Sequence, residues 1–470
     1  MLNNDLTRQI KRNFCYKPTE EQENAIVMLS DFLLKPENDT IFLLKGYAGT
    51  GKTSLIGAFV KALSEFGVKF VLMAPTGRAA KVFSHHAGVS AYTIHKKIYR
   101  QQSYAEDRFS LNKNLHKNTV FIVDEASMIS NTGYSGNTFG SGRLLDDLIQ
   151  YVYSGDSCRL ILVGDNAQLP PVGEEESPAL YSEMLRGYGC DVVERLLTEV
   201  VRQSGRMGIL YNATKLRMQI VTDDIYDLPR FNVKDFPDVR VIPGNELIEA
   251  INTCYDKAGL DETMIICRSN KRANLYNNGI RNSILYREDE LNSGDVLMVT
   301  KNNYYWTEDC KEMDFIANGD IAVVRRVRRI REMYGFRFAD VVLTFPDHND
   351  IELELKVLLD TLHSDAPSLS KDDSDKLFNT IMEDYSDIAN KNERIKKLKE
   401  DAYYNALQVK YAYAVTCHKA QGGQWQRVFI DQGYMTEDML SPDYYRWLYT
   451  AITRATDTLY LVNWPDSQTE

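Results

Sequence analysis

One eight-residue stretch combines glycines, a lysine and a hydroxyl side chain in the spacing that phosphate binding requires. Residues 46–53 read Gly-Tyr-Ala-Gly-Thr-Gly-Lys-Thr, a complete G-x-x-x-x-G-K-T loop. Its glycines allow backbone N–H groups to turn inward around phosphate oxygens, at the start of a helix whose dipole favours anions. We expect Lys52 to reach the β and γ phosphates of a nucleotide and the Thr53 hydroxyl to ligate Mg²⁺. The predicted nucleotide-binding residues of the loop are Gly46, Ala48, Gly49, Thr50, Gly51, Lys52 and Thr53.

A pair of carboxylates supplies the second part of this chemistry. Asp124 and Glu125 directly follow the apolar run 120–123, which predicts a strand. At the end of that strand Asp124 can hold Mg²⁺, directly or through water. Glu125 can orient and polarise an attacking water, so hydrolysis rather than phosphoryl transfer is expected. An Asp-Glu pair often only caps a helix, and its weight here comes from the strand before it and the phosphate loop elsewhere in the chain.

The elements that must position these groups belong to an α/β fold. The apolar run 41–44 precedes the loop and predicts a buried strand, and residues 54–64 follow it with a helical pattern. Further apolar runs that predict strands lie at 68–74, 160–163, 264–267, 409–415 and 459–462. Because the pattern restarts downstream without a second phosphate loop, we expect two RecA-like P-loop domains with parallel sheets and one nucleotide between them.

Three residues on later loops are candidates for contact with the γ-phosphate. Gln168 follows the run 160–163, where a glutamine can sense the γ-phosphate and touch a bound strand at once. Arg202 is a candidate arginine finger, and Arg454 of the downstream half would reach across the cleft. An arginine that arrives only when the cleft closes stabilises transition-state charge and ties hydrolysis to domain motion. The predicted catalytic set is Lys52, Asp124, Glu125, Gln168, Arg202 and Arg454.

The order of short motifs along the chain resembles a known family. In sequence order they read Gly-Tyr-Ala-Gly-Thr-Gly-Lys-Thr, Ala-Pro-Thr-Gly-Arg-Ala-Ala, Thr-Ile-His, Asp-Glu-Ala-Ser-Met, Gly-Asp-Asn-Ala-Gln-Leu-Pro-Pro-Val, Thr-Glu-Val-Val-Arg-Gln, His-Lys-Ala-Gln-Gly and Thr-Ala-Ile-Thr-Arg-Ala. This set resembles the motifs of superfamily-one DNA helicases, with the RecD-like, Dda-like and Pif-one-like branch as the best match. Members of that branch move 5′ to 3′ along DNA. The resemblance covers nearly the whole chain and implies ATP and Mg²⁺ as cofactors.

The same resemblance gives a role to a segment near the N-terminus. Residues 19–22 look like the Q motif, in which Gln22 would read the adenine base. A glutamine amide suits this task because it can pair with both the N6 donor and the N7 acceptor of adenine. The same residues also form a capping-box pattern with Thr19 as the N-cap, and the two interpretations are compatible.

Contacts with DNA are likewise implied by the resemblance. Thr76 and Thr93, beside His95, would grip strand phosphates on the first domain, and Thr416 and His418 would do so on the second. The predicted DNA-binding residues are Pro75, Thr76, Thr93, His95, Phe109, Thr416, His418 and Lys419. Few of them carry charge, so we expect sequence-independent binding with a modest salt dependence. The expected partners are single-stranded DNA and duplex or forked DNA, with G-quadruplex DNA as a further candidate, bound by a monomer.

The first insert covers about 99–115 and predicts a β-hairpin turning at 105–107. In the resembled family this place holds a pin that splits the duplex, and Phe109 or Tyr104 near its tip could stack on a base. An ordinary surface loop is the alternative.

The second insert covers about 295–402. Its short apolar runs with glycine turns predict a small barrel, and the family has an SH3-like domain here. The charged helical pattern of 370–407 predicts an arm that lays the barrel back on the second motor domain. The aromatic residues 304–306 could stack on DNA or fill the barrel core.

These observations divide the chain into three predicted domains. The first motor domain spans 1–205, the second comprises 206–294 and 403–470, and the barrel with its arm spans 295–402. The segment 131–142 is rich in glycine and serine, and no function follows from it.

Composition limits the possible partners. The net charge of −11 argues at first against nucleic acid, but a strand-tracking enzyme needs only a local groove. Basic clusters lie at 325–331 and 391–399. Each could instead be a solvated face, and this interpretation is favoured for the second, helical cluster. Apolar runs of membrane-spanning length and a signal-peptide core are absent from the sequence. The seven scattered cysteines lack the spacing of zinc or disulfide sites, so we expect a cytoplasmic protein, nucleoid-associated and of bacterial or phage type.

The sequence therefore predicts an ATP-dependent 5′-to-3′ DNA helicase that translocates on single-stranded DNA and unwinds duplex. Two alternatives stay open. One is an ATP-gated nucleic-acid-binding switch that hydrolyses ATP without unwinding. The other is an RNA-directed translocase, because phosphate contacts do not report the sugar.

Overall fold

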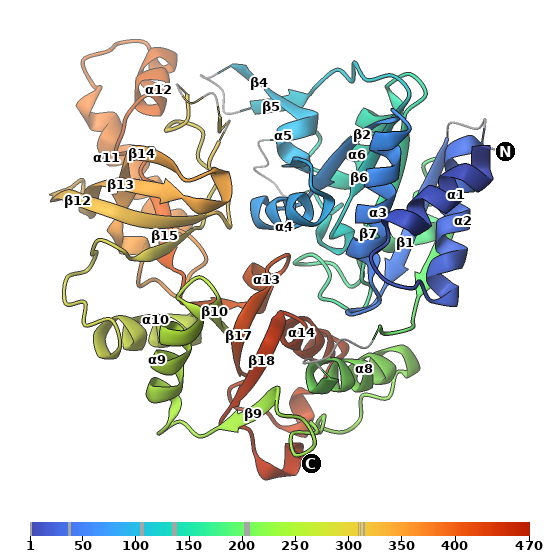
Figure 1. The fold of residues 1–470 in the computed structure, drawn as a ribbon. Helices are drawn as coiled ribbons and strands as arrows, with labels where there is room; N and C mark the ends of the chain where they lie inside the picture. The colour runs from blue at the N-terminus through green and yellow to red at the C-terminus, as the bar shows by residue number, and fades with distance from the viewer. Residues whose placement is uncertain are drawn as a thin grey trace.

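Two parallel sheets, a closed barrel and a two-stranded hairpin make up the fold (Figure 1). This arrangement confirms the predicted α/β class with its hairpin and barrel inserts. Within the described ranges, no helix is both long and apolar enough to cross a membrane. The computed structural model describes residues 2–35, 39–103, 108–133, 139–201, 207–308, 310, 312–313 and 315–470.

The first sheet has the strand order β3-β2-β6-β7-β1-β8, and all its strands are parallel. Alternate residues of β1 enter two different cores, Ile41 and Leu43 on one face, and Phe42 and Leu44 on the other, because helices cover both faces. The strands are β1 (Thr40–Gly46), β2 (Lys69–Ala74), β3 (Ala91–Thr93), β6 (Thr119–Val123), β7 (Arg159–Gly164) and β8 (Asp191–Leu197). The helices are α1 (Leu2–Asn13), α2 (Glu20–Leu34), α3 (Lys52–Glu65), α4 (Gly77–Ala87), α5 (Ile94–Ile98), α6 (Leu144–Tyr153) and α7 (Ser182–Arg186).

The second sheet has the order β16-β10-β17-β18-β9 and is also parallel. Figure 1 shows α13 and α14 between this sheet and the first domain. Its strands are β9 (Val239–Ile242), β10 (Thr263–Cys267), β16 (Ala414–Thr416), β17 (Trp425–Asp431) and β18 (Ala455–Val462). Its helices are α8 (Met207–Thr222), α9 (Leu247–Ala258), α10 (Asn270–Ser283), α13 (Cys417–Ala420) and α14 (Pro442–Ile452).

Five strands close the barrel, which extends beyond its expected boundary at residue 402. They are β11 (Val296–Val299), β12 (Ile321–Met333), β13 (Phe336–Phe345), β14 (Ile351–Leu358) and β15 (Leu407–Tyr411). The predicted single strand 409–415 is wrong, because the run is shared by β15 of the barrel and β16 of the second sheet. Every residue from 409 to 415 is buried, so hydrophobicity alone gives no sign of the break.

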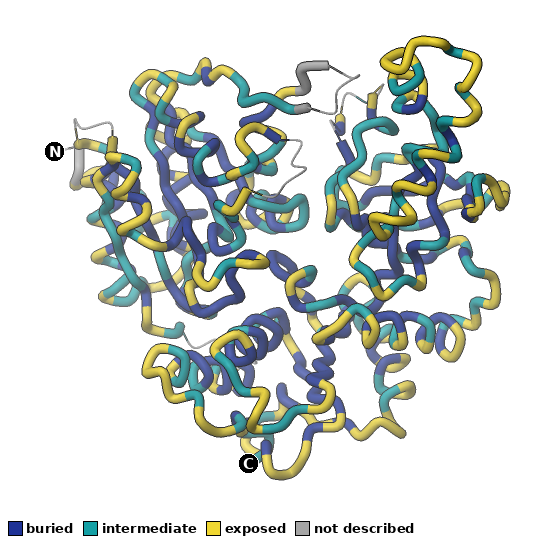
Figure 2. The backbone as a smooth tube through the Cα atoms, turned by 180° about the vertical axis from the view of Figure 1, so that it is seen from behind, coloured by how far each residue is buried: buried dark blue, intermediate teal, exposed yellow. Residues whose placement is uncertain are grey.

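The charged arm packs on the barrel and not on the second motor domain, which corrects the expectation. It consists of α11 (Lys371–Asp384) and α12 (Lys391–Lys399). Leu377, Ile381 and Leu398 are buried against barrel residues, including Phe336 and Phe338. These few apolar positions seal one end of the barrel, while Figure 2 shows that much of the arm backbone is exposed.

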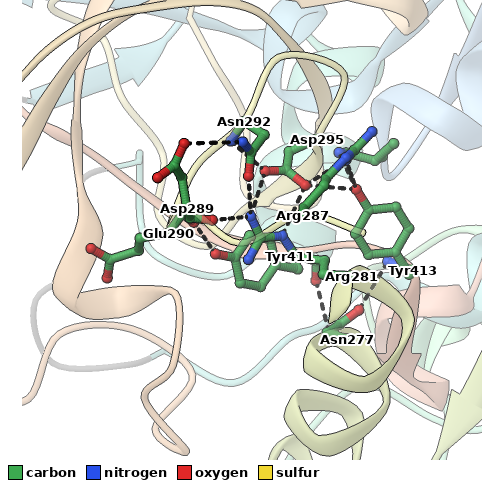
Figure 3. A network of polar contacts seen from close by, with 10 residues as sticks. Asn277, Arg281, Arg287, Asp289, Glu290, Asn292, Asp295, Tyr411 and Tyr413 are labelled. Atoms are coloured by element: carbon green, nitrogen blue, oxygen red, sulfur yellow. Dashed lines mark hydrogen bonds and ion pairs between the residues drawn. The ribbon is translucent and has the colours of Figure 1, made fainter. Parts of the chain in front are cut away.

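A buried cluster around Asp295 fixes the barrel to the second motor domain (Figure 3). The Asp295 carboxylate is fully buried and accepts hydrogen bonds from Arg281 Nε at 3.0 Å and Arg287 Nη1 at 2.5 Å. The hydroxyl of Tyr413 donates to the same carboxylate at 2.9 Å. Arg281 belongs to α10, whereas Asp295 precedes β11 and Tyr413 follows β15. The chain enters the barrel near Asp295 and leaves it near Tyr413. The cluster therefore holds both of these connecting segments against helix α10 of the second domain.

The first insert forms the predicted hairpin. Strand β4 (Tyr99–Ser103) pairs in antiparallel fashion with β5 (Arg108–Leu111). The connecting residues 104–107, including the candidate base-stacking residue Tyr104, lie outside the described residues.

Candidate nucleotide and nucleic-acid site

The phosphate loop joins β1 to the N-terminus of α3, at the carboxyl edge of the first sheet. Gly49 and Gly51 have φ values of 77° and 78°, which favour glycine because a side chain would be strained there. A Cβ atom at Gly46 would lie 2.8 Å from the Thr50 hydroxyl. Strand β7 lies between β6 and β1, so the loops after these three strands meet at one edge. The phosphate loop therefore makes a tight turn, and its backbone can surround a phosphate chain.

Lys52 is the first residue of α3 and folds over the loop. Its ammonium group donates to the carbonyl of Gly46 at 2.6 Å and to that of Tyr47 at 3.0 Å. Thr53 follows it in the first turn of a 14-residue helix. This geometry places a cation, a hydroxyl and a helix N-terminus together, as binding of a Mg²⁺-nucleotide requires.

Gln22 supports the phosphate loop in this structure. It is 2% exposed, its Oε1 accepts from Thr19 N at 2.9 Å, and its Nε2 donates to the Thr50 carbonyl at 2.9 Å. The predicted capping box is present. This placement does not favour the expected contact with adenine, because the oxygen and the nitrogen of the Gln22 amide already bond to other residues of the protein. The sequence pattern could not reveal this use, since the partner carbonyl lies 28 residues away.

Asp124 and Glu125 follow β6 as predicted. Burial, together with the nearby Glu125 carboxylate, raises the pKa of Asp124 to about 7, while Lys52 acts in the opposite direction. A divalent cation would relieve this repulsion, which fits a Mg²⁺ site. Glu125 has a φ of 52°, an uncommon conformation for a residue other than glycine. Strain of this kind is frequent at catalytic positions, where it aims a side chain.

Gln168 lies on the loop after β7 and is 5% exposed. Its Oε1 has no hydrogen-bond partner among the described residues. An unpaired buried acceptor is costly unless a bound group satisfies it. A water next to the γ-phosphate would supply the missing donor.

The phosphate loop is covered by residues of the second motor domain and of the chain segment that leads into it. Arg217 of α8 stacks on the Tyr47 ring at 4.3 Å. The side chain of Leu210, also on α8, would contact a Cβ placed on Gly49 at 2.7 Å. Val201 N donates to the Gly49 carbonyl at 2.9 Å. The next residue, the candidate finger Arg202, lies outside the described residues.

Arg454 is held within its own domain. It is 3% exposed and donates from Nε to the Thr450 carbonyl at 3.0 Å and from Nη1 to the Gly423 carbonyl at 3.3 Å. Its Nη2 donates to the Thr453 hydroxyl at 3.2 Å. The structure therefore does not bring its guanidinium to the phosphate loop, and the role as a finger requires these bonds to be exchanged for phosphate oxygens.

We predict that Arg454→Lys will lower kcat for ATP by about a thousandfold and change KM little, because a lysine keeps the charge but cannot bind a phosphate in bidentate fashion. Steady-state ATPase assays with single-stranded DNA measure this. The midpoint of thermal unfolding is the control, since the three bonds also hold Gly423 and Thr450. A variant that loses thermal stability and retains kcat would assign Arg454 a purely structural role.

Tyr449, Thr450 and Gln421 of the second domain bond across the cleft, and sequence reasoning missed these contacts. The hydroxyl of Tyr449 accepts from Ala48 N at 2.8 Å and donates to Asp165 at 2.7 Å. Thr450 and Gln421 both bond to the backbone of Leu169 at 2.8 Å. These residues lie inside or beside the motifs quoted above, but their sequence spacing does not distinguish them from residues of the core.

The predicted DNA-contacting threonines all begin helices. Thr76 and Thr93 use their side-chain oxygens to cap α4 and α5. Each hydroxyl can still donate its hydrogen to a phosphate. Thr416 precedes α13 without a side-chain capping bond. Pro75 lies directly before Thr76, and His418 is exposed on α13. These residues come from the two domains that share the nucleotide site.

The two segments that carry the predicted DNA contacts approach each other closely. A Cβ atom at Gly422 would lie 3.3 Å from the Thr76 hydroxyl and 2.9 Å from Ala79 Cβ. Beside them, the Arg78 guanidinium stacks on the Trp425 ring at 4.0 Å. A glycine is therefore needed where the second domain meets α4.

His95, one of the predicted DNA-binding residues, lies in an apolar environment. Burial lowers its pKa to about 4, so the imidazole is neutral near pH 7. Its ring packs against Phe139 at 4.8 Å and Tyr99 at 5.7 Å. A neutral imidazole can still donate one hydrogen bond, but its surroundings are aromatic.

Phe109 is the second residue of β5 and its ring packs within the protein in this structure, so base stacking by this residue stays a prediction. Its ring contacts Phe139 at 4.8 Å, Tyr304 at 4.4 Å and Phe315 at 6.5 Å. Residue 139 belongs to the segment 131–142, so the described end of that segment packs on the hairpin. Tyr304 and Phe315 come from the barrel insert. The hairpin base is thus braced by an aromatic cluster shared with the barrel, and Tyr304 fills this contact.

Lys419 is a predicted DNA-binding residue whose pKa departs strongly from its usual value. Burial and the nearby Lys410 lower its pKa to about 8. We predict that single-stranded DNA affinity will fall about tenfold between pH 7 and pH 9, because the phosphate-binding ammonium loses its proton in the free protein. Lys419→Arg should flatten this dependence, since arginine stays charged. Fluorescence anisotropy against pH measures both; equal pH slopes would show that Lys419 does not bind phosphate.

Two family profiles match the chain. An AAA domain matches residues 19–221, which contain the phosphate loop, the carboxylate pair and Gln168. A UvrD-like helicase C-terminal domain matches residues 411–462, which contain α13, α14 and most of the second sheet.

Curated relatives agree with these matches, and one solved structure is reported beside them. The ATP-dependent DNA helicase dda of Enterobacteria phage T4 is 29% identical over 60% of this chain and 60% of its own length. The ATP-dependent RecD2 DNA helicase of Deinococcus radiodurans is 24% identical over 94% of this chain and 48% of its own length. The Pif1 helicase from Candida albicans has a TM-score of 0.48 at 15% identity, with 96% of each chain covered.

The fold and the site define a P-loop ATPase with two RecA-like domains. The ordered motifs, the matched domains and the curated relatives support a further step: the chain is similar to the superfamily-one helicases of the RecD- and Dda-like branch, which are ATP-hydrolysing enzymes. The resemblance found in the sequence is thereby confirmed.

Proposed function

We propose that the protein translocates 5′ to 3′ on single-stranded DNA and unwinds the duplex ahead of it, driven by ATP hydrolysis between the two motor domains. One observation carries the proposal. The loop after β7 lies beside the phosphate site and is hydrogen-bonded by Gln421 and Thr450 of the second domain. Gln421 directly follows α13, which carries His418 and Lys419. A change at the phosphate site can therefore reach the strand-binding segment through bonded neighbours.

The proposed chemistry assigns one task to each group at the first domain. Lys52 and the N-terminus of α3 bind phosphate oxygens, and Thr53 and Asp124 hold Mg²⁺, which neutralises developing charge on those oxygens. Glu125 takes the proton of the attacking water. Gln168 orients that water through its unpaired oxygen. Arg454 and Arg202 would add positive charge when the cleft is closed around ATP.

The proposed movement alternates between two grips on the strand. Thr76 and Thr93 hold phosphates on the first domain, and Thr416, His418 and Lys419 hold them on the second. Each cycle closes the cleft, shifts one grip and reopens it one step onward. The hairpin, braced at Phe109, parts the complementary strand.

Strand separation on tailed duplexes tests this function and its direction. A 5′ single-stranded tail should support unwinding and a 3′ tail should not, in the presence of ATP and Mg²⁺. Unwinding from the 3′ tail alone would reverse the direction and leave the ATPase assignment intact. Matched RNA tails test the RNA-directed alternative, and forked and quadruplex substrates measure the preferred DNA structure.

A hairpin variant separates the helicase from an ATP-gated binding switch. Residues 104–107 are replaced by an Asn-Gly turn, which shortens the hairpin and preserves its pairing. We expect this variant to retain DNA-stimulated ATPase activity and translocation and to lose unwinding. If wild-type protein hydrolyses ATP on DNA but unwinds no tailed duplex, the switch is the better assignment.

A further inference from the structure

The hydroxyl of Tyr449 lies at the boundary between the two motor domains. Tyr449 belongs to α14 of the second domain and is 1% exposed. Both hydrogen bonds of its hydroxyl go to the first domain: it accepts from Ala48 N at 2.8 Å and donates to Asp165 Oδ2 at 2.7 Å. One oxygen atom therefore joins the phosphate loop to the loop that carries Gln168.

The protonation of this phenol suits both bonds. Burial and the negative charge of Asp165 raise the pKa of Tyr449 well above its usual value. The hydroxyl consequently keeps its hydrogen and donates to the carboxylate. The other oxygen of Asp165 accepts from Ala167 N at 3.0 Å, within the same loop. A charged acceptor makes the Tyr449 bond stronger than a bond between neutral groups.

Two neighbouring bonds extend the contact toward the strand-binding segment. The Thr450 hydroxyl accepts from Leu169 N, and Gln421 Nε2 donates to the Leu169 carbonyl, both at 2.8 Å. The loop 165–169 is thus held at its start by Tyr449 and at its end by Thr450 and Gln421. Because Gln421 directly follows α13, ordering of α13 by a bound strand would also order this loop.

We propose that Tyr449 is a positioning residue that couples strand binding to ATP hydrolysis, by fixing the phosphate loop against the Gln168 loop when the second domain is docked. The inference rests on the proposed function, because it concerns the same ATP site and the same strand. The Tyr449 hydroxyl bonds to Ala48 and Asp165 in the docked arrangement of the two domains that this structure has, and separation of the domains would break both bonds. Strand binding that stabilises the docked arrangement therefore also aligns the groups that act on the water.

The same helix offers a matched control one turn earlier. Tyr445 is also fully buried, and its hydroxyl donates to the carbonyl of Asp227 within the second domain. Tyr449→Phe and Tyr445→Phe remove the same atom from the same helix. Only the first removes a bond that crosses the cleft.

The experiment measures ATP hydrolysis with and without saturating single-stranded DNA for the wild type and both variants. The readout is the stimulation factor, which is the kcat with DNA divided by the kcat without it. For Tyr449→Phe we expect this factor to fall about ten- to a hundredfold, as loss of a hydrogen bond to a charged group predicts, with KM for ATP less affected. Tyr445→Phe should keep the wild-type factor. Thermal unfolding checks that both variants fold.

The possible outcomes separate this inference from the proposed function. A wild-type protein without DNA-stimulated ATPase activity would contradict the proposed function, whatever Tyr449 does. If the wild type is stimulated and Tyr449→Phe retains the full factor, the coupling role is wrong. An equal fall of kcat with and without DNA in Tyr449→Phe also contradicts the coupling role, because the stimulation factor is then unchanged. Gln421→Leu should reproduce the reduced factor, and the double variant should be no worse than the stronger single one, since both bonds act on one loop.

Discussion

Replacing Lys52 with alanine is expected to abolish ATP hydrolysis and to leave single-stranded DNA binding intact when no nucleotide is present. The ammonium group of Lys52 lies over the phosphate loop, bonded to the carbonyls of Gly46 and Tyr47. Without it, the γ-phosphate and the transition state lose a point charge in a partly buried site. We expect kcat to fall by roughly three orders of magnitude or more. Steady-state phosphate release, together with DNA binding by anisotropy, measures both parts of the prediction.

Lys61→Ala provides the matched control for this variant. Lys61 lies on the same helix, α3, but is exposed to solvent. It should hydrolyse ATP at the wild-type rate. Near-normal turnover by Lys52→Ala would refute the assignment of the phosphate site, and loss of nucleotide-free DNA binding would indicate that Lys52 supports the fold.

Replacing Glu125 with glutamine should separate nucleotide binding from chemistry. Glutamine keeps the size of the side chain and the same left-handed backbone strain, but it cannot take a proton from water. We expect turnover to fall by roughly two to four orders of magnitude. ATP should still bind and close the cleft, so DNA affinity should keep its dependence on nucleotide.

Single-turnover hydrolysis and DNA binding with and without ATP measure these two effects. Glu249→Gln, at an exposed position of α9, is the control for the loss of one negative charge. If Glu125→Gln no longer binds nucleotide, the strained residue shapes the site instead of acting as a base.

The parts of the site that the sequence predicted are those in which a local motif dictates both the chemistry and the conformation. The glycines before Lys52 determine the loop, and the apolar strand before Asp124 determines where the carboxylates emerge. Because the strands are parallel, the loops that follow them lie at the same edge of the sheet, and no other feature of the sequence is needed to predict this. The hairpin and the barrel were also predictable, because alternating apolar residues and glycine turns are local signals.

Residues whose environment depends on distant parts of the chain were predicted less well. Gln22 bonds to Thr50, and Phe109 packs on Tyr304 of the barrel, although neither segment indicates its partner. His95 is neutral because of the rings around it, which no local pattern reports. Tyr449 looks like one more apolar position of α14, and only the docked first domain shows what its hydroxyl does.

The split of the run 409–415 between β15 and β16 has the same physical origin. Every residue of the run 409–415 is buried, so hydrophobicity stays continuous while the chain passes from barrel to sheet. The arm of α11 and α12 was placed on the wrong domain for a related reason. Its two charged helices bury only a few apolar side chains, Leu377, Ile381 and Leu398 among them. So few apolar positions do not identify the surface that they cover.

The cluster around Asp295 has a mechanical consequence for the hairpin. It ties both chain crossings of the barrel to α10, so we expect the barrel and the second motor domain to turn together. Removing a partner from a buried ion pair costs about 3–5 kcal/mol, so this joint does not act as a hinge. A rotation that widens the cleft must therefore carry Tyr304 and Phe315 away from Phe109. We therefore expect the hairpin to lose its aromatic support from the barrel as the motor domains separate.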